Sequence, residues 1–262
     1  MCGRLLAHAG QVTEQALPGG YVNVVTLVGG TVRRKVTPRA EFVHRVLAHL
    51  ASHGWTGAPA YLGLDDQGRE TLSYLPGHVA WQRDQPGGVR SVMSLARTAQ
   101  LVRELHDLTA GTELAGECEV VCHNDLSPRN TVYQDLGAGL RPVAFIDWDL
   151  AGPGRRIHDL GHVCWQYLNL GPDSWVGTDE AAAAECGRLI RVICDGYGLA
   201  DRSELLDAIL WWQQRCWRGI RAAADAGEPT MIRLRETGAV AAVQAAYQWT
   251  LRHRAIIDQA LA

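Results

Sequence analysis

The segment VVCHNDLSPRNTVY, residues 120–133, decides the fold of this chain, because it places a polar loop between two apolar runs of β character. Asp125 and Asn130 lie within that loop. The Ser127-Pro128 pair between them favours a turn over a helix, and a turn can bring both side chains to one side of the loop. We therefore expect a strand, a functional loop and a second strand here.

A further β run, VAFI at residues 143–146, leads directly into Asp147-Trp148-Asp149. Asp125, Asn130 and Asp147 then supply oxygen donors at the ends of neighbouring strands. Carboxylate and amide oxygens suit a hard cation such as Mg2+, which also accepts water and substrate phosphates as ligands. The pattern predicts a Mg2+ site.

Both segments resemble those of a known enzyme family. His123-Asn124-Asp125 together with Asn130 is similar to the HxDxxxxN catalytic loop of protein-kinase-like enzymes. Ile146-Asp147-Trp148-Asp149 is similar to the metal-binding element of the aminoglycoside phosphotransferase family. The two motifs occur in the family's order with a short hairpin between them, and weaker likenesses extend the resemblance through most of the chain.

The resemblance implies phosphorylation of a hydroxyl on a small molecule by ATP or GTP. Asp125 would orient that hydroxyl and accept its proton, while Asn130 and Asp147 would hold Mg2+ against the nucleotide phosphates. Asp149 would contact the substrate or a second metal ion. Because phosphoryl transfer depends mostly on positioning and charge neutralisation, these few groups suffice.

The segment His158-Asp159-Leu160-Gly161-His162 allows two interpretations. The resemblance implies that Asp159, with His123, supports the catalytic loop and does not react. The two histidines are also superficially similar to those of a zinc hydrolase helix. The acid between them is Asp, however, Gly161 weakens a helix, and no third ligand is evident, so we favour the first interpretation.

The segment LPGGYVN, ahead of the first long β run, is similar to the family's nucleotide loop, in which small residues let backbone amides approach phosphates. The resemblance assigns Gly19, Gly20 and Asn23 to the nucleotide, although Gly-Gly before a strand is equally a turn. Tyr74 and Leu75 end a later β run, where the family places the hinge whose backbone holds adenine.

Kinase-like folds use a lysine on the third strand to meet the phosphates. Strand alternation puts Arg34 on the same face as Val32, the relation that the family's basic residue has to a small apolar partner, so we expect Arg34 rather than Lys35 in this role. The glutamate usual on the following helix is displaced, because Glu41 precedes the expected place and Val43 occupies it. The sequence therefore does not identify an acid partner for Arg34.

Two regions of the chain differ in character. Residues 1–76 hold short β runs, a Gly29-Gly30 turn and one helical pattern, whereas residues 77–262 hold long helical stripes and most of the nine tryptophans. We expect an α+β, two-lobed protein-kinase-like fold. A small, mainly β N-lobe (1–76) would bind nucleotide, and a larger, mainly helical C-lobe (77–262) would carry the catalytic loop and the acceptor-binding helices.

The composition argues against several other classes. A formal net charge of -3 gives no basic footprint for nucleic acid, and no apolar run is long enough to span a membrane. The seven cysteines are odd in number and lack a CxxC pair, which fits a reducing cytoplasm better than a disulfide framework. Lys35 is the only lysine and follows Arg34 where a Walker A loop needs glycine, so that loop is excluded.

The resemblance favours an antibiotic or a related natural product as the hydroxylated acceptor, and so resistance by O-phosphorylation. After Val163, however, Asp and Glu nearly balance Arg, so the helical region is not the strongly acidic surface that would suit a polycationic aminoglycoside. The alternative is a non-catalytic kinase-like immunity or binding protein. Arg34 and the displaced Glu41 are the features that favour it.

Overall fold

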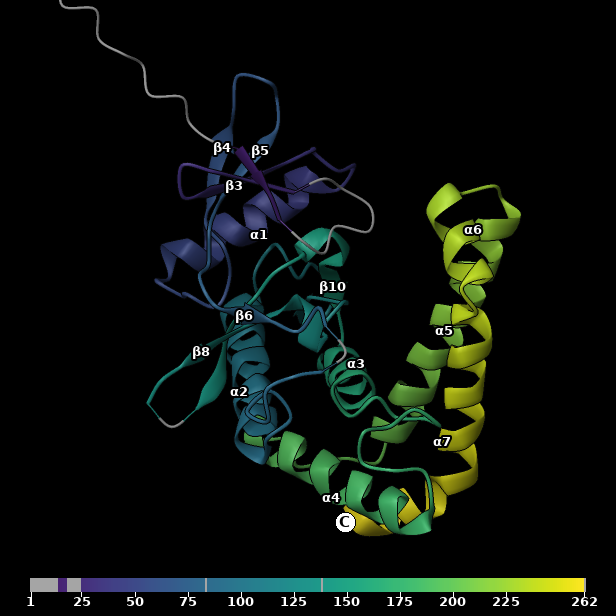
Figure 1. Cartoon of the computed structure of the whole chain (residues 1–262). Helices are drawn as coiled ribbons and strands as arrows, with labels where there is room; N and C mark the ends of the chain where they lie inside the picture. Colours follow the sequence, from purple (N-terminus) through teal and green to yellow (C-terminus); the bar gives the residue numbers. More distant parts are fainter. Residues whose placement is uncertain (1–13, 18–24, 83, 138, 262) are drawn as a thin grey trace, which may run out of the picture.

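The computed structural model describes residues 14–17, 25–82, 84–137 and 139–261. It confirms the expected two-lobed α+β fold, in which a five-stranded sheet with one helix lies beside a larger, mainly helical part (Figure 1). The first elements are β1 (Glu14–Ala16), β2 (Thr26–Val28), β3 (Thr31–Arg34), α1 (Ala40–Ser52), β4 (Tyr61–Leu64) and β5 (Glu70–Ser73). They are followed by β6 (His78–Val79), α2 (Val92–Thr109), β7 (Val120–Cys122), η1 (Pro128–Asn130), β8 (Thr131–Asp135), β9 (Leu140–Phe145), η2 (Trp148–Leu150) and β10 (Gly152–Gly154). The last elements are α3 (Arg156–Leu168), α4 (Glu180–Tyr197), α5 (Leu205–Asp225), α6 (Pro229–Glu236) and α7 (Ala239–Leu261).

The first sheet is antiparallel and has the strand order β1-β2-β3-β5-β4. Strands β2 and β3 form the hairpin that the sequence predicts, with Val28 opposite Thr31. The two residues between them, Gly29 and Gly30, have φ values of 55° and 78°. Positive φ at both positions matches the twist of a tight hairpin and favours glycine.

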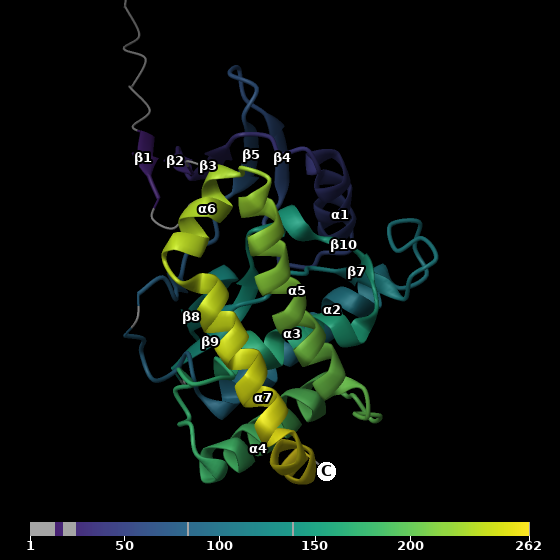
Figure 2. The same ribbon diagram turned by 90° about the vertical axis from the view of Figure 1, so that its right-hand side faces the viewer.

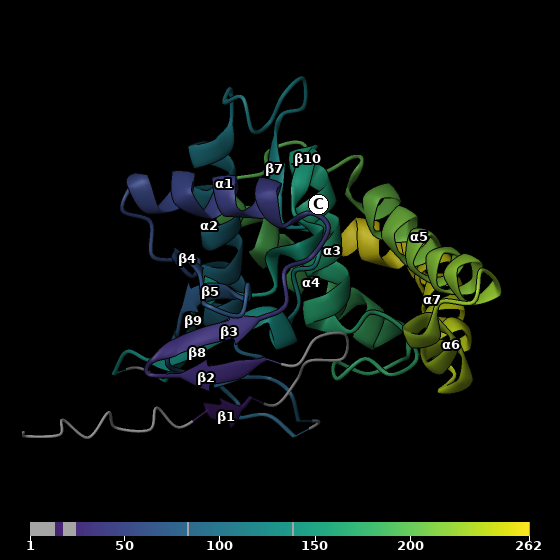
Figure 3. The ribbon, with the colours of Figure 1, turned by 90° about the horizontal axis from the view of Figure 1, so that it is seen from above.

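Helix α1 lies beside this sheet and buries one apolar face (Figures 1 and 3). Its buried apolar side chains on that face are Val43, Val46, Leu47 and Leu50. Their spacing is that of a helix with one apolar stripe, and they join the main core of the molecule. Because α1 also contacts η2, it connects the first sheet to the segment that follows Asp147.

The chain leaves the first sheet after β5 and enters a second sheet at β6, which pairs with β8. The connection lies close to β8, because a Cβ at Gly77 would be 2.6 Å from the carbonyl oxygen of Tyr133. Strand β8 pairs in turn with β9, and β7 pairs with β10 in a third, two-stranded sheet. The ends of these short strands carry the polar loops singled out in the sequence.

Long helices make up the rest of the molecule. Helix α3 packs against α5, and α4 packs against both α2 and α7. Figures 1 and 2 show α5 and α7 running alongside each other, with α6 at one end of the pair. Among the described helices, none combines the length and the apolarity needed to cross a membrane.

Candidate active site

The loop after β7 is fixed by a buried carboxylate from helix α3. Asp159 is fully buried, and its two oxygens accept backbone N–H groups from His123 at 2.8 Å and Asn124 at 2.9 Å. His106 of α2 lies 3.2 Å from the same carboxylate. Burial by itself raises the pKa of Asp159, but the hydrogen bonds from His106 and Asn124 outweigh it and hold the pKa below its usual range. Asp159 is therefore a charged anchor, and it holds Asn124 at a left-handed φ of 64°.

Two buried histidines extend this support. The ring of His123 donates from Nε2 to the carbonyl oxygen of Ile146 at 3.1 Å and accepts the N–H of Asp125 at 3.3 Å. His162 of α3 donates from Nδ1 to the carbonyl oxygen of Leu126 at 2.9 Å. Burial lowers the pKa of both histidines to about 4, so both are neutral near pH 7. The catalytic loop is thereby tied to helix α3 and to the segment that carries Asp147.

Asp125 and Asn130, separated by the turn at residues 126–129, meet in the folded chain. The side-chain nitrogen Nδ2 of Asn130 donates to Asp125 Oδ2 at 2.8 Å and to the backbone carbonyl oxygen of Asp125 at 2.9 Å. This orientation leaves Asn130 Oδ1 as the atom that can bind a cation. Burial raises the pKa of Asp125 to about 7, and the charge of Asp147 contributes. A carboxylate with a pKa near neutrality is well suited to accept a proton from a hydroxyl.

Asp147 follows β9 and has a left-handed φ of 64°. Partial burial and the charge of Asp149 raise the pKa of Asp147, although Arg34 opposes the shift. The charges of Asp147 and Asp149 also raise the pKa of Asp125, so three carboxylates repel one another here. Such an excess of negative oxygen donors fits Mg2+, which neutralises carboxylates that repel one another. Asn130 and Asp147 are the residues that would hold it.

Arg34 lies at the end of β3 and is 8% exposed. Its Nε is 2.6 Å from Glu70 Oε1, its Nη2 donates to Asp149 Oδ1 at 2.6 Å, and its Nη1 is 3.6 Å from Asp147 Oδ1. Burial lowers the pKa of Arg34, but the charges of Asp149, Glu70 and Asp147 reverse this and raise it. Lys35, by contrast, is exposed.

Glu70, the acid beside Arg34, was missed in the sequence. It opens β5, directly opposite Arg34 in the β3–β5 register, and its Oε2 accepts a hydrogen bond from His44 of α1 at 2.7 Å. Val43 points into the core and Glu41 is exposed. Its neighbours Arg69 and Thr71 are polar, so the local sequence gave no signal that Glu70 is buried. It could not identify the partner, because the pairing of β3 with β5 skips a helix and a strand.

The residues assigned to the nucleotide are only partly described. Gly19, Gly20 and Asn23 lie outside the described residues, so their assignment stays a prediction. Tyr74 and Leu75 follow β5 directly, at the passage from the first sheet to the second, and Tyr74 is 39% exposed. Their backbone role toward adenine also stays a prediction.

The two histidines of α3 serve different neighbours. His158 stacks on Trp211 of α5, with ring centroids 4.8 Å apart and planes 11° apart, whereas His162 bonds to the catalytic loop. Within the described part of the chain, one group of three possible metal ligands has its ligand atoms within 4.8 Å of one another. It consists of His106, Cys122 and Asp159. Both oxygens of Asp159 already accept hydrogen bonds. The geometry therefore gives the zinc interpretation no support.

Helix α5 lies close to the catalytic loop on the side of α3. Burial raises the pKa of Cys216 to about 11, and the charge of Asp125 adds to the shift. Trp212 fixes the helix by donating to the carbonyl oxygen of His158 at 2.6 Å. Figure 2 shows α5 alongside α3. The sequence did not connect Cys216 with Asp125, because the two residues are far apart in the chain.

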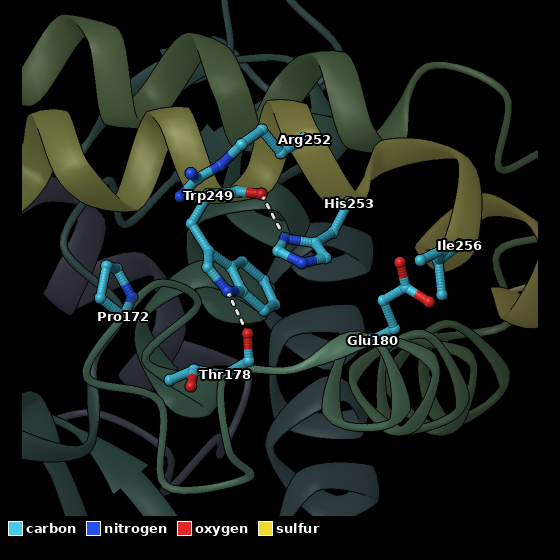
Figure 4. Close-up of a pocket in the computed structure, with 7 residues that line it drawn as sticks. All are labelled: Pro172, Thr178, Glu180, Trp249, Arg252, His253 and Ile256. Atoms are coloured by element: carbon cyan, nitrogen blue, oxygen red, sulfur yellow. Dashed lines mark hydrogen bonds between the residues drawn. The ribbon is translucent and has the colours of Figure 1, made fainter.

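A separate surface pocket of about 660 Å³ lies between α7 and the start of α4 (Figure 4). Its lining residues are Pro172, Thr178, Glu180, Trp249, Arg252, His253 and Ile256. Trp249 donates to the carbonyl oxygen of Thr178 at 2.9 Å, and His253 donates to that of Trp249 at 2.9 Å. Since the lining includes no residue of the catalytic or metal loop, this pocket is distinct from the site described above.

Comparison with known proteins supports the same interpretation of the loops. Residues 114–205, which contain both motifs, match the model of the phosphotransferase enzyme family. A curated relative, the trifolitoxin immunity protein of Rhizobium leguminosarum bv. trifolii, is 29% identical over 279 residues and covers 95% of this chain and 99% of the relative.

Solved structures match over most of the chain. One is a putative aminoglycoside phosphotransferase from Ralstonia eutropha, with a TM-score of 0.61, 15% identity and 94% of each chain covered. Another is an aminoglycoside phosphotransferase from Streptomyces rimosus in complex with ADP and streptomycin, with a TM-score of 0.56, 16% identity, and 78% of this chain and 91% of that one covered. The chain thus has the fold of the protein-kinase-like small-molecule kinases, and the resemblance to the aminoglycoside phosphotransferase family that its two motifs predict is confirmed.

Proposed function

We propose that this protein is a nucleoside-triphosphate-dependent O-phosphotransferase acting on a hydroxylated small molecule. The observation that carries the proposal is the convergence of Asp125, Asn130 and Asp147 with Arg34, which brings together a base, oxygen ligands for a cation and a fixed positive charge. The nucleotide is ATP or GTP, and Mg2+ is the metal that the donor set fits.

In the proposed reaction, the acceptor hydroxyl oxygen forms a bond to the γ-phosphorus as the bond to the nucleoside diphosphate breaks. Asp125 orients the hydroxyl and takes its proton. Arg34 offers its guanidinium to the phosphates, and Asn130 keeps the Asp125 carboxylate in place through the 2.8 Å hydrogen bond. Mg2+ supplies charge neutralisation on the phosphate oxygens when bound.

For the acceptor we propose an antibiotic or related natural product that enters beside α5 and the catalytic loop. The near balance of acidic and basic residues after Val163 favours a neutral acceptor over a polycation. Phosphorylation of a toxic compound would protect the cell, in line with the name of the immunity protein that this chain resembles. Since the donor is a cytoplasmic nucleotide, we propose that the protein acts in the cytoplasm.

A screen of hydroxylated antibiotics, other natural products and nucleosides tests the proposal. Purified protein is incubated with ATP or GTP and Mg2+, and both nucleoside diphosphate release and the phosphorylated product are measured. We expect one acceptor class to raise diphosphate release and to gain a phosphoryl group, and Asp125→Asn to abolish both. Nucleotide binding without transfer to any acceptor would contradict the proposal.

A second candidate is a non-catalytic immunity protein, which the match to the trifolitoxin immunity protein over 95% of this chain favours. The two functions make opposite predictions for protection in a sensitive host. If protection depends on phosphorylation, Asp125→Asn removes it although the protein accumulates normally. If the fold acts only by binding, Asp125→Asn protects as well as the parent.

A further inference from the structure

Arg34 is held by three carboxylates that differ in exposure. Glu70 is 1% exposed and lies behind the guanidinium, in contact with Nε. Asp149 and Asp147 have side chains that are 24% and 49% exposed, and they face the two Nη atoms. The Nη side of the guanidinium therefore borders the partly exposed carboxylates, whereas Nε is buried against Glu70.

The position of Glu70 is determined by the sheet. Arg34 and Glu70 are directly opposite each other on β3 and β5, so the backbone pairing of the two strands sets the distance between their side chains. The Nε to Oε1 separation is 2.6 Å. The two charges thus form a buried ion pair, and the strand register limits where both side chains can lie.

His44 uses the other oxygen of Glu70. Its Nε2 donates to Oε2 at 2.7 Å, while Oε1 faces Arg34 in the ion pair. The imidazole also stacks on Tyr61 of β4, with centroids 3.6 Å apart and planes 11° apart. Helix α1 is thus joined to Arg34 through His44 and Glu70.

We propose that Glu70 and His44 are positioning residues that aim Arg34 at the nucleotide phosphates. Strand β5 supplies the acid that the resemblance led us to expect on helix α1, and His44 restores the connection of that helix to the basic residue. Phosphate oxygens replace Asp149 and Asp147 at the two Nη atoms, while Glu70 stays paired with Nε. This inference rests on the proposed function, because it requires that the site binds a nucleotide.

A double-mutant cycle tests the inference. The dissociation constants of Mg2+–ATP and Mg2+–GTP are measured by calorimetry for the parent, Glu70→Gln, Arg34→Met and the double variant, and the melting temperature of each is recorded. Because the change removes the buried charge beside Arg34, we expect Glu70→Gln to weaken nucleotide binding about tenfold. In the Arg34→Met background the same change should alter affinity by less than about twofold, because Glu70 then has no guanidinium to position.

Variants of His44 give an independent readout. His44→Phe keeps a ring for Tyr61 but loses the donor to Glu70, whereas His44→Gln keeps a donor and loses the ring. We expect weaker nucleotide binding in His44→Phe and recovery toward the parent in His44→Gln. Glu41→Gln, which changes an exposed acid of the same helix, is the matched control and should bind like the parent.

Two results would overturn the inference while leaving the proposed function intact: unchanged affinity in both Glu70→Gln and His44→Phe, or equal losses from Glu70→Gln in both backgrounds. Equal losses would mean that Glu70 acts through general stability, and the melting temperatures would show it. A parent protein that binds neither nucleotide would instead overturn the proposed function itself.

Discussion

Asp159 and Glu70 are both buried carboxylates, but they hold the two sides of the site in different ways. Asp159 accepts two backbone N–H groups of the catalytic loop, and backbone donors cannot turn away from it. Glu70 contacts only side chains, and its partner Arg34 also faces two exposed aspartates. The backbone thus fixes the loop that carries Asp125, whereas the position of Arg34 depends on side-chain charges for which a ligand can compete.

The largest expected effect is the loss of phosphoryl transfer when Asp125 is changed. Asp125→Asn should slow transfer to the acceptor found in the screen by about 100-fold to 10,000-fold, the usual cost of losing a general base. The amide oxygen can still accept the hydrogen bond from Asn130, so nucleotide affinity should stay within about twofold. Single-turnover transfer and nucleotide titration measure the two quantities. Parental transfer by this variant would disprove the assignment of Asp125.

Removal of the loop's anchor should affect stability more than nucleotide binding. Asp159→Ala leaves the N–H groups of His123 and Asn124 buried without their acceptor, at a cost of about 1 to 3 kcal/mol in the free energy of unfolding. Urea denaturation measures the change, with the exposed Asp66→Ala as the control. An unchanged free energy of unfolding combined with loss of Mg2+-dependent nucleotide binding would move Asp159 from the anchor to the metal site.

The free energy of unfolding should also depend on pH through His162, which supports the loop that carries Asp125. His162 has a pKa of about 4 when folded, against about 6.5 in an unfolded chain, so its contribution is complete above pH 6.5 and is lost as pH falls toward 4. By pH 5 the unfolded state binds a proton that the folded state excludes, which costs about 2 kcal/mol. His162→Gln keeps a donor for Leu126 and should reduce the loss of stability between pH 7 and pH 5 by that amount.

Urea denaturation at the two pH values measures this difference. Substitution of the exposed His53 by Gln should leave it unchanged. If His162→Gln loses as much stability as the parent between pH 7 and pH 5, then His162 is not the group that takes up the proton.

The smallest expected effect is a difference in Mg2+-dependent nucleotide affinity between variants of the two proposed metal ligands, Asp147 and Asn130. Asp147→Asn should weaken Mg2+-dependent nucleotide binding by about tenfold, because it removes a charge that holds a hard cation. Asn130→Ala should weaken binding less and transfer more, since Asn130 also fixes Asp125. Titrations with Mg2+ and again with EDTA distinguish the two, and Asp173→Asn serves as an exposed control. Parental affinity that is the same in EDTA would argue against the metal site.

Local sequence was enough to predict the loops whose residues are near neighbours in the chain. The turn at Ser127-Pro128 and the β runs on either side were enough to predict that Asp125 and Asn130 lie in one loop, and the folded chain brings them within 2.8 Å. The β2–β3 hairpin was predictable for the same reason, because two glycines encode its turn locally.

The side chains around Arg34 come together through contacts that form only in the folded chain. Glu70 reaches it through the pairing of β3 with β5, and His44 reaches Glu70 through the docking of α1 on the sheet. Neither pairing has a local signature, since the burial of a charged side chain depends on elements that meet only after folding. Sequence reasoning therefore predicted the residues that we propose act on the substrate, and missed Glu70 and His44, which lie beside Arg34 and Glu70 in the folded chain.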